Sequence, residues 1–236
     1  MFYPMMYFDP TYILVLIGVI LSLIASGMVK STFAKYAKVR NTRGMTGAEA
    51  AERVLHGAGI YDVRVEHVSG NLTDHYDPRS KVLRLSDSVY GQTSVAAVGV
   101  AAHECGHAIQ HAKGYGPLKL RSTLVPIANF GSKIAWPLIL IGLLFNSESS
   151  TLFINLGIIA FTGAVAFQLI TLPVEYNASN RAIRMIADTG LMQGEEIQAA
   201  KKVLNAAALT YVAGAATAIL QLLRIILLTG GRRRND

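Results

Sequence analysis

Four long apolar runs constrain this 236-residue chain more than any other feature of its sequence. They cover residues 11–29, 125–145, 152–172 and 206–228. About 20 apolar residues in a helix cross the roughly 30 Å hydrocarbon core of a bilayer, so each run is long enough to span a membrane. Only 16% of the residues are charged, whereas soluble domains carry roughly 25%. We therefore expect a mainly α integral membrane protein with about four transmembrane helices.

The distribution of basic residues predicts the orientation of these runs. Residues 1–10 contain no Lys or Arg, whereas Lys30, Lys35 and Lys38 closely follow the first run. Because positive charge accumulates at the cytoplasmic ends of membrane helices, the N-terminus is expected outside. Thirteen of the 22 Lys and Arg residues fall within 30–124, so this polar stretch is expected at the cytoplasmic face.

The last apolar run leaves two arrangements open. It contains Arg224 and is followed by arginines at 232–234, which a fourth span would place outside, against the positive-inside rule. Otherwise this Ala- and Gly-rich helix packs along or into the bundle. We predict the fourth span, with the link at 146–150 outside and residues 173–205 in the cytoplasm.

The polar stretch has the pattern of a small α+β domain. Thr46-Gly47-Ala48-Glu49 is a capping box, which predicts a helix to about residue 56. Residues 62–68 and 81–85 alternate polar and β-branched side chains, as strands do. This strand pair either offers an edge to an extended peptide or forms a hairpin that only covers the next helix. That helix is expected over 93–113.

The sequence His103-Glu104-Cys105-Gly106-His107 lies within this last helix. Residues i and i+4 share one helix face, so both imidazoles can bind one zinc ion. Glu104 could then take a proton from the attacking water and deliver it to the leaving amine. The alternative is a buried helix with two hydrogen-bonded histidines, which explains less well why an Ala- and Val-rich helix gathers these residues. Cys105 points away from the ligand face and is expected to pack.

A catalytic zinc ion needs a third protein ligand. Lys113 occupies the position that supplies it in HExxHxxGxxH proteases, and His111 lies awkwardly far along the helix. The best carboxylate is Glu175, just after the third apolar run and on the predicted cytoplasmic side. Alternatively, Glu175 stabilises the dipole of a helix that starts or kinks at Pro173.

Two further side chains are candidate catalytic residues, as donors to the oxyanion of the reaction. His75 lies in the connection between the two strands, where the alternative is a loop held by turns at Asp74 and Asp77. Arg181 follows the third-ligand candidate and could donate to the oxyanion or pair with Asp188.

Four segments of the chain resemble the YugP-like family of bacterial membrane proteins, which are described as neutral zinc metallopeptidases. They are LTDHYDP (72–78), AHECGHAIQ (102–110), TLPVEYNAS (171–179) and NAAALTY (205–211). More distantly, the chain is similar to gluzincin membrane proteases of the HtpX type, which pair HExxH with a Glu-x-x-Ala-Asp segment. Glu175 matches their third ligand, whereas Ser179 replaces the Asp that supports a zinc-binding His, a role left here to Asn177 or Asp77.

The resemblance implies a membrane-integral zinc endopeptidase. His103, His107 and Glu175 would bind Zn²⁺, and Glu104 would act as the general base and acid at the cytoplasmic face. An intramembrane protease of the site-2 type would need an Asp in a later span, which the apolar runs lack. A non-catalytic membrane adaptor with a structural zinc site is the alternative, but such a site does not need Glu104.

These inferences divide the chain into five parts. They are a transmembrane anchor (1–29), a cytoplasmic metallopeptidase domain (30–124), a transmembrane hairpin (125–172), a cytoplasmic helical segment with the third ligand (173–205), and a C-terminal membrane helix with a basic tail (206–236). The expected partners are a polypeptide substrate that is itself a membrane protein, the lipid bilayer and a membrane partner subunit. No nucleic acid is expected despite the net charge of +7. The expected location is the bacterial cell membrane, which the chain crosses several times.

Overall fold

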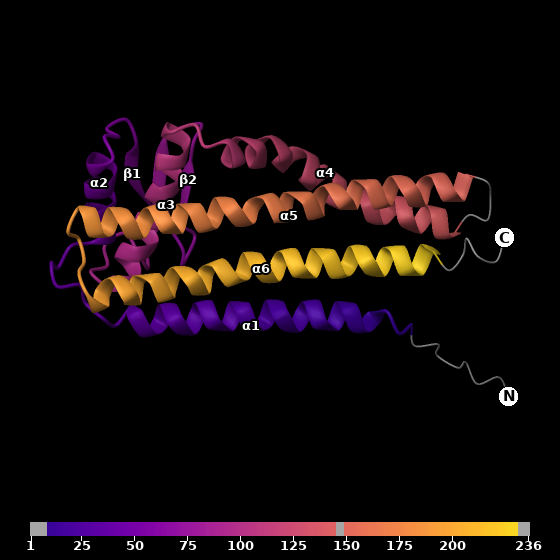
Figure 1. Cartoon of the computed structure of the whole chain (residues 1–236), viewed down its shortest axis with the longest axis horizontal. Coiled ribbons are helices and arrows are strands. Elements are labelled where there is room, and N and C mark those ends of the chain that lie inside the picture. Colours follow the sequence, from indigo (N-terminus) through magenta and orange to yellow (C-terminus); the bar gives the residue numbers. More distant parts are fainter. Residues whose placement is uncertain (1–8, 145–148, 231–236) are drawn as a thin grey trace. The chain divides into compact units, whose positions relative to one another are not determined.

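The computed structural model describes residues 9–144 and 149–230, which form six helices and three strands. The elements in chain order are α1 (Tyr12–Tyr36), α2 (Gly47–Gly57), β1 (Arg64–Val68), β2 (His75–Asp77), β3 (Val82–Ser86), α3 (Val95–Ala112), α4 (Gly116–Leu144), α5 (Ser149–Asp188) and α6 (Glu195–Gly230) (Figure 1). Contacts divide them into two compact units. The apolar unit comprises the described parts of 1–24, 122–169 and 211–236, and the polar unit comprises 25–121 and 170–210.

Helices α1, α4, α5 and α6 are each long and apolar enough to cross a membrane. The remaining elements are two shorter helices and a three-stranded sheet. Together they confirm the predicted fold class, a mainly α membrane protein with a small α+β part. The predicted link at 146–150 lies mostly outside the described residues, and the arginines at 232–234 lie entirely outside them.

The four long helices continue beyond the apolar runs into polar sequence. Helix α5 is the clearest case, because its 40 residues include both the third run and Glu175. Pro173 lies inside this helix rather than at its start. The alternative that made Glu175 a first-turn residue is therefore wrong, and one helix carries an apolar run and the third-ligand candidate. The boundaries between the polar and apolar units lie within the four long helices α1, α4, α5 and α6, not at helix ends.

Small residues allow the helices of the apolar unit to approach one another closely. A Cβ on Gly131 of α4 would lie 2.7 Å from the carbonyl oxygen of Ala160 on α5. A Cβ on Gly157 of α5 would lie 2.9 Å from the carbonyl oxygen of Ala135 on α4. Close backbone contact through small residues is typical of membrane helix pairs.

The charge of Arg224 on α6 is compensated within the apolar unit. Its Nη2 lies 3.5 Å from Asp9 Oδ2, and its Nε donates to Thr11 Oγ1 at 3.3 Å. The guanidinium also lies 4.2 Å from the centroid of the Tyr12 ring. Charged side chains in membrane helices are costly unless they are paired, so these contacts explain how an apolar run accommodates an arginine.

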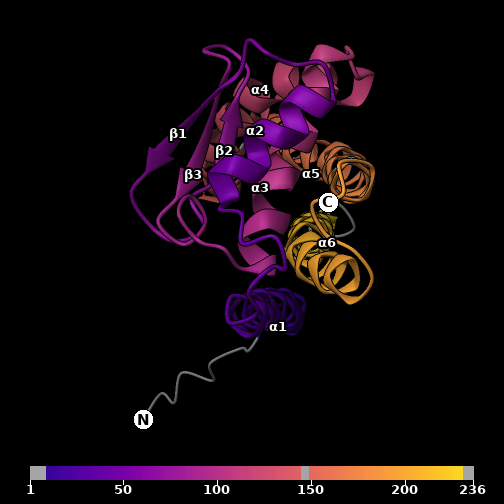
Figure 2. The same ribbon diagram turned by 90° about the vertical axis from the view of Figure 1, so that its left-hand side faces the viewer.

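The polar unit is built on helices α2 and α3, which pack against each other and against the sheet (Figure 2). Helix α2 begins with the predicted capping box: Thr46 Oγ1 accepts from Glu49 N at 3.2 Å, and Glu49 Oε2 accepts from Thr46 N at 2.8 Å. The core between these elements is filled mainly by aliphatic side chains, among them Leu55, Leu83, Leu85, Val98 and Ile109.

The sheet differs from the predicted arrangement. Strands β1 and β3 correspond to the two predicted strands, but they pair in parallel, so the hairpin alternative is wrong. A third strand, β2, lies within the connection between them and pairs antiparallel with β3, which gives the order β1-β3-β2. Leu72 and Lys81 take left-handed φ values of 56° and 51° on either side of β2, where the chain turns in and out of this strand. As a result, β2 is an edge strand beside α3.

Asp74 anchors this edge strand, and its removal should loosen β2. The carboxylate accepts from Ser86 N at 2.7 Å and from Ser86 Oγ at 3.0 Å. Because a hydrogen bond to a charged group contributes about 1.5–3 kcal/mol, Asp74→Ala should increase amide hydrogen exchange in residues 74–77 by about tenfold or more. Asn71→Ala in the same connection is the control. Equal exchange in both variants would contradict this role of Asp74.

Candidate metal centre

Helix α3 brings the two histidines of the motif to one face. Ser94 caps the helix by accepting from Ala97 N at 3.1 Å, and most residues from Val95 to Gln110 are buried. His103 and His107 lie one turn apart, with ring centroids 4.9 Å from each other and ring planes at 86°. Both side chains retain a small exposed area, 14% and 12%, within an otherwise buried helix.

The contact between α3 and α5 brings Glu175 to these histidines. Gly106 lies between His103 and His107 in sequence, and a Cβ there would be 2.4 Å from the carbonyl oxygen of Ala178. Only glycine allows the two backbones to approach so closely. Glu175 and Ser179, on either side of Ala178 along α5, thereby face the two imidazoles.

The three side chains converge on one point. Glu175 Oε2 lies 3.3 Å from His103 Nε2 and 3.5 Å from His107 Nε2. Two ligand atoms bound at 2.0–2.1 Å to one tetrahedral zinc ion lie about 3.3 Å apart, which matches both distances. Glu175 Oε2 is also fully buried and has no hydrogen-bond partner among the described residues. A buried carboxylate oxygen without a partner is costly, and a cation between these atoms would satisfy it. The residues therefore fit a zinc ion.

Hydrogen bonds on the far side of each imidazole orient the Nε2 atoms. His107 Nδ1 lies 3.0 Å from Gln110 Oε1, while Gln110 Nε2 donates to Val174 O at 2.8 Å and to Asn177 Oδ1 at 3.0 Å. Because Val174 O and Asn177 Oδ1 both accept from the amide nitrogen of Gln110, its Oε1 faces His107 and can only accept. Nδ1 of His107 is therefore the donor, and its Nε2 carries the free lone pair. Such partners orient the histidine ligands of metal sites.

Ser179 plays the corresponding part for His103. Its Oγ lies 3.1 Å from His103 Nδ1. The residue that replaces the Asp of the HtpX-type segment thus holds this histidine itself. The expectation that Asn177 or Asp77 would take the role is wrong in the described structure, because Asn177 binds Gln110 and Arg181, and Asp77 binds Arg79 and Ser80.

Sequence reasoning missed Arg121. This residue of α4 places its Nη1 3.1 Å from Glu175 Oε1. The guanidinium thus neutralises one oxygen of a carboxylate that is only 1% exposed and leaves the other oxygen to the histidines. An arginine early in a long helix, some 50 residues before its partner in sequence, gives no signal that a sequence pattern could detect.

The electrostatics of the site favour a cation. Burial lowers the pKa of His107, but the negative charges of Glu175 and Glu104 outweigh burial and raise that pKa above its ordinary value. Glu104 itself is only 9% exposed and follows His103 directly on α3. Two carboxylates thus surround the imidazoles, and Arg121 offsets part of their charge.

The two remaining catalytic candidates, His75 and Arg181, have other described contacts. His75 Nδ1 is 2.9 Å from Thr73 O, in the connection before β2, and its Nε2 is 3.5 Å from Arg84 Nη1 on β3. Arg181 donates to Asn177 Oδ1 at 2.7 Å and lies over the ring of Tyr115. It therefore joins the hydrogen-bond network that orients His107 through Gln110.

His111 and Cys105 have other contacts. His111 Nδ1 lies 2.9 Å from the hydroxyl of Tyr76 on β2, which links the edge strand to α3. Cys105 is fully buried, and its Sγ lies 3.5 Å from Ala51 O. Burial raises the pKa of this thiol, so Cys105 is suited to packing rather than to nucleophilic chemistry.

Comparisons with known proteins extend over both units. The sequence model of a family described as "putative neutral zinc metallopeptidase" matches residues 11–230. A curated protein of Bacillus subtilis (strain 168), "Putative membrane protease YugP", is 50% identical over 216 residues, which are 91% of this chain and 95% of that protein. No solved structure matches the chain.

Gly106→Ala should separate α3 from α5 and weaken zinc binding. The added Cβ would meet the backbone of Ala178, which can move only if Glu175 moves with it. We expect about a tenfold or greater loss of zinc affinity, measured by competition with a chelator. Gly99→Ala is a matched control on the same helix, because its Cβ would make an ordinary contact 3.4 Å from the Cβ of Ala200. Equal zinc affinity in both variants would contradict the proposed contact.

Ser179→Ala should weaken zinc binding without unfolding the protein. The variant removes the hydrogen-bond partner of His103 Nδ1 and leaves the three candidate ligands in place. Loss of such a partner costs about 10- to 100-fold in metal affinity. Asn180→Ala, at the neighbouring exposed position, should retain full affinity. Unchanged affinity in Ser179→Ala would show that His103 is oriented by something else.

Proposed function

Because this chain belongs to the family described as "putative neutral zinc metallopeptidase", we propose that it is a membrane-integral, zinc-dependent endopeptidase. The observation that carries the proposal is the convergence of His103 Nε2, His107 Nε2 and Glu175 Oε2 next to Glu104. Three protein ligands with an open fourth position are the pattern of a catalytic zinc site, whereas a structural site uses a fourth protein ligand.

The chain's own residues divide the chemistry between them. His103, His107 and Glu175 would hold the zinc ion, which when bound polarises the peptide carbonyl and lowers the pKa of water. Glu104 accepts the proton of the attacking water and passes it to the nitrogen of the leaving amine. Arg121, Gln110 and Ser179 keep the ligand side chains in place.

A peptide substrate would bind along β2. This strand is at the edge of the sheet, and Tyr76 joins it to His111, one turn beyond His107 on α3. An extended peptide can add to such an edge through backbone hydrogen bonds, which would lay it beside the ligand helix. Of the two oxyanion donors proposed, we favour Arg181 over His75, because Arg181 belongs to the network around His107.

The active site is proposed to lie at the cytoplasmic membrane face. The apolar unit contains five of the 22 Lys and Arg residues, which are Lys133, Arg224 and the arginines at 232–234, whereas the polar unit contains the other 17. This asymmetry favours a cytoplasmic polar unit. Glu175 follows the third apolar run by three residues, about 4.5 Å along the helix, so membrane proteins and their membrane-adjacent segments are the proposed substrates.

The proposal predicts that Glu104→Gln loses peptide hydrolysis and retains zinc. General acid–base catalysis contributes about 10²- to 10⁴-fold, so specific cleavage should fall by that factor. Newly formed peptide N-termini would be compared between membranes carrying the wild type and the variant, with zinc content measured in both. Glu52→Gln, an exposed residue of α2, is the control.

The same measurement separates the enzyme from a non-catalytic adaptor with a structural zinc site. In an adaptor, Glu104→Gln would leave both the zinc content and the set of N-termini unchanged. Such a result, obtained with membranes from cells in which the wild type is functional, would contradict the endopeptidase proposal.

A further inference from the structure

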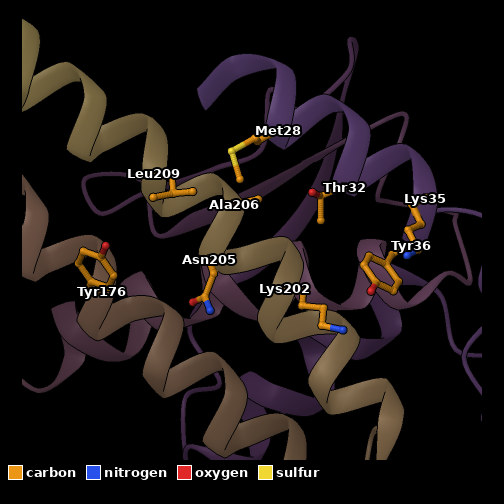
Figure 3. A pocket seen from close by; sticks show the side chains of 9 residues that line it. All are labelled: Met28, Thr32, Lys35, Tyr36, Tyr176, Lys202, Asn205, Ala206 and Leu209. Atoms are coloured by element: carbon orange, nitrogen blue, oxygen red, sulfur yellow. The ribbon is translucent and has the colours of Figure 1, made fainter. Parts of the chain in front are cut away.

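A cavity of about 630 Å³ lies within the polar unit between α1, α5 and α6 (Figure 3). It is distinct from the candidate metal centre, since its lining includes none of His103, His107 and Glu175. Its volume is typical of a site for a small molecule. None of the residues described above as catalytic candidates lines it.

The lining of this cavity changes in the same way along two helices. On α1, Met28 is followed one turn later by Thr32 and after a further turn by Lys35. On α6, which is read in the opposite direction, Leu209 is followed by Asn205 and then Lys202. Figure 3 shows Met28 and Leu209 toward one end of the cavity and both lysines toward the other. Two helices thus place apolar, neutral polar and cationic side chains at matching levels.

The apolar end of the cavity lies where the apolar runs begin or end. Met28 is at the end of the first run, and Leu209 is near the start of the last run. Lys35 lies seven positions after Met28, about 10 Å along a helix, and Lys202 lies seven positions before Leu209. The headgroup region on each side of a bilayer is about 5–7.5 Å thick, so this distance is long enough to reach from acyl chains to charged headgroups.

The charged end of the cavity attracts anions. Neither Lys35 nor Lys202 has an ion pair within residues 9–144 and 149–230, although Lys35 Nζ lies 5.4 Å from the centroid of the Tyr36 ring. The described lining contains no acidic residue, and Thr32, Asn205 and the two tyrosines supply neutral hydrogen-bonding groups. Two lysines with hydrogen-bond donors beside them suit a phosphate group.

We propose that this cavity binds the headgroup of an anionic phospholipid. Lys35 and Lys202 contact the phosphodiester, Thr32 and Asn205 hydrogen-bond to its oxygens, and Met28 and Leu209 pack against the first acyl carbons. Basic pockets at the cytoplasmic ends of membrane helices are suited to such lipids. A soluble phosphate would not use the apolar end, where Met28 and Leu209 are 44% and 37% exposed.

The test uses the full-length protein in detergent, titrated with dioleoylphosphatidylglycerol or dioleoylphosphatidylcholine and observed by native mass spectrometry. The double variant Lys35→Gln/Lys202→Gln removes both charges from the cavity. Lys30→Gln/Lys201→Gln removes two charges from the same helices at neighbouring exposed positions that do not line it. Zinc content, measured in every sample, reports whether the fold is retained.

We expect the wild type to bind phosphatidylglycerol more tightly than phosphatidylcholine. One lysine near a membrane surface contributes about a fivefold factor, so the cavity variant should bind phosphatidylglycerol about thirtyfold more weakly than the wild type. The control variant should change much less. If the double variant loses zinc, the single variants Lys35→Gln and Lys202→Gln should each show about a fivefold loss.

Three results would overturn the proposal. Equal losses of phosphatidylglycerol affinity in the cavity and control variants would show that the lipid binds to a general basic surface. No loss of affinity in the cavity variant would show that the cavity does not hold the lipid. Inorganic phosphate, added at constant ionic strength, should not displace the lipid at comparable concentration. If phosphate displaces it and Met28→Ser binds phosphatidylglycerol like the wild type, the occupant is a soluble anion.

Discussion

The close contact of α3 with α5 at Gly106 is the constraint on which the candidate metal centre depends. It puts the backbone of Ala178 where a side chain of residue 106 would otherwise lie. Once this contact forms, the helical period places Glu175 and Ser179 on the face toward the motif. His103 then meets both residues, and His107 meets Glu175. Because α5 also contains the third apolar run, the geometry of the site and the course of a membrane helix are set by the same 40 residues.

Burial of a carboxylate beside two imidazoles is stable only if each of its oxygens has a partner. Arg121 supplies the partner for Oε1 of Glu175, whereas Oε2 is directed at the two Nε2 atoms. With Nδ1 of His107 already donating to Gln110, its Nε2 offers a lone pair to the same point as the carboxylate. A divalent cation at this point would relieve the repulsion between these lone pairs, and the folding of this part of the chain would then depend on metal binding.

Local sequence patterns predicted the features that depend on residues close together in the chain. The i, i+4 spacing of His103 and His107 and the capping box at Thr46 lie within single helices, and the four apolar runs need only length and composition. Glu175 was identified by its distance after an apolar run and by resemblance to known proteases. Arg121, Gln110 and the role of Ser179 depend on contacts between helices and were not predictable. The parallel pairing of β1 with β3 was missed for a related reason: alternation predicts strands but not their partners.

Neighbouring residues of α5 face different sites, so this helix connects the candidate metal centre with the cavity between α1, α5 and α6. Glu175 is 1% exposed and faces α3, whereas the adjacent Tyr176 is 42% exposed and lines the cavity with α1 and α6. Consecutive residues of a helix point about 100° apart, so one turn of α5 forms part of both walls. A ligand that ordered the cavity would therefore restrict the same turn that must hold Glu175 near the histidines.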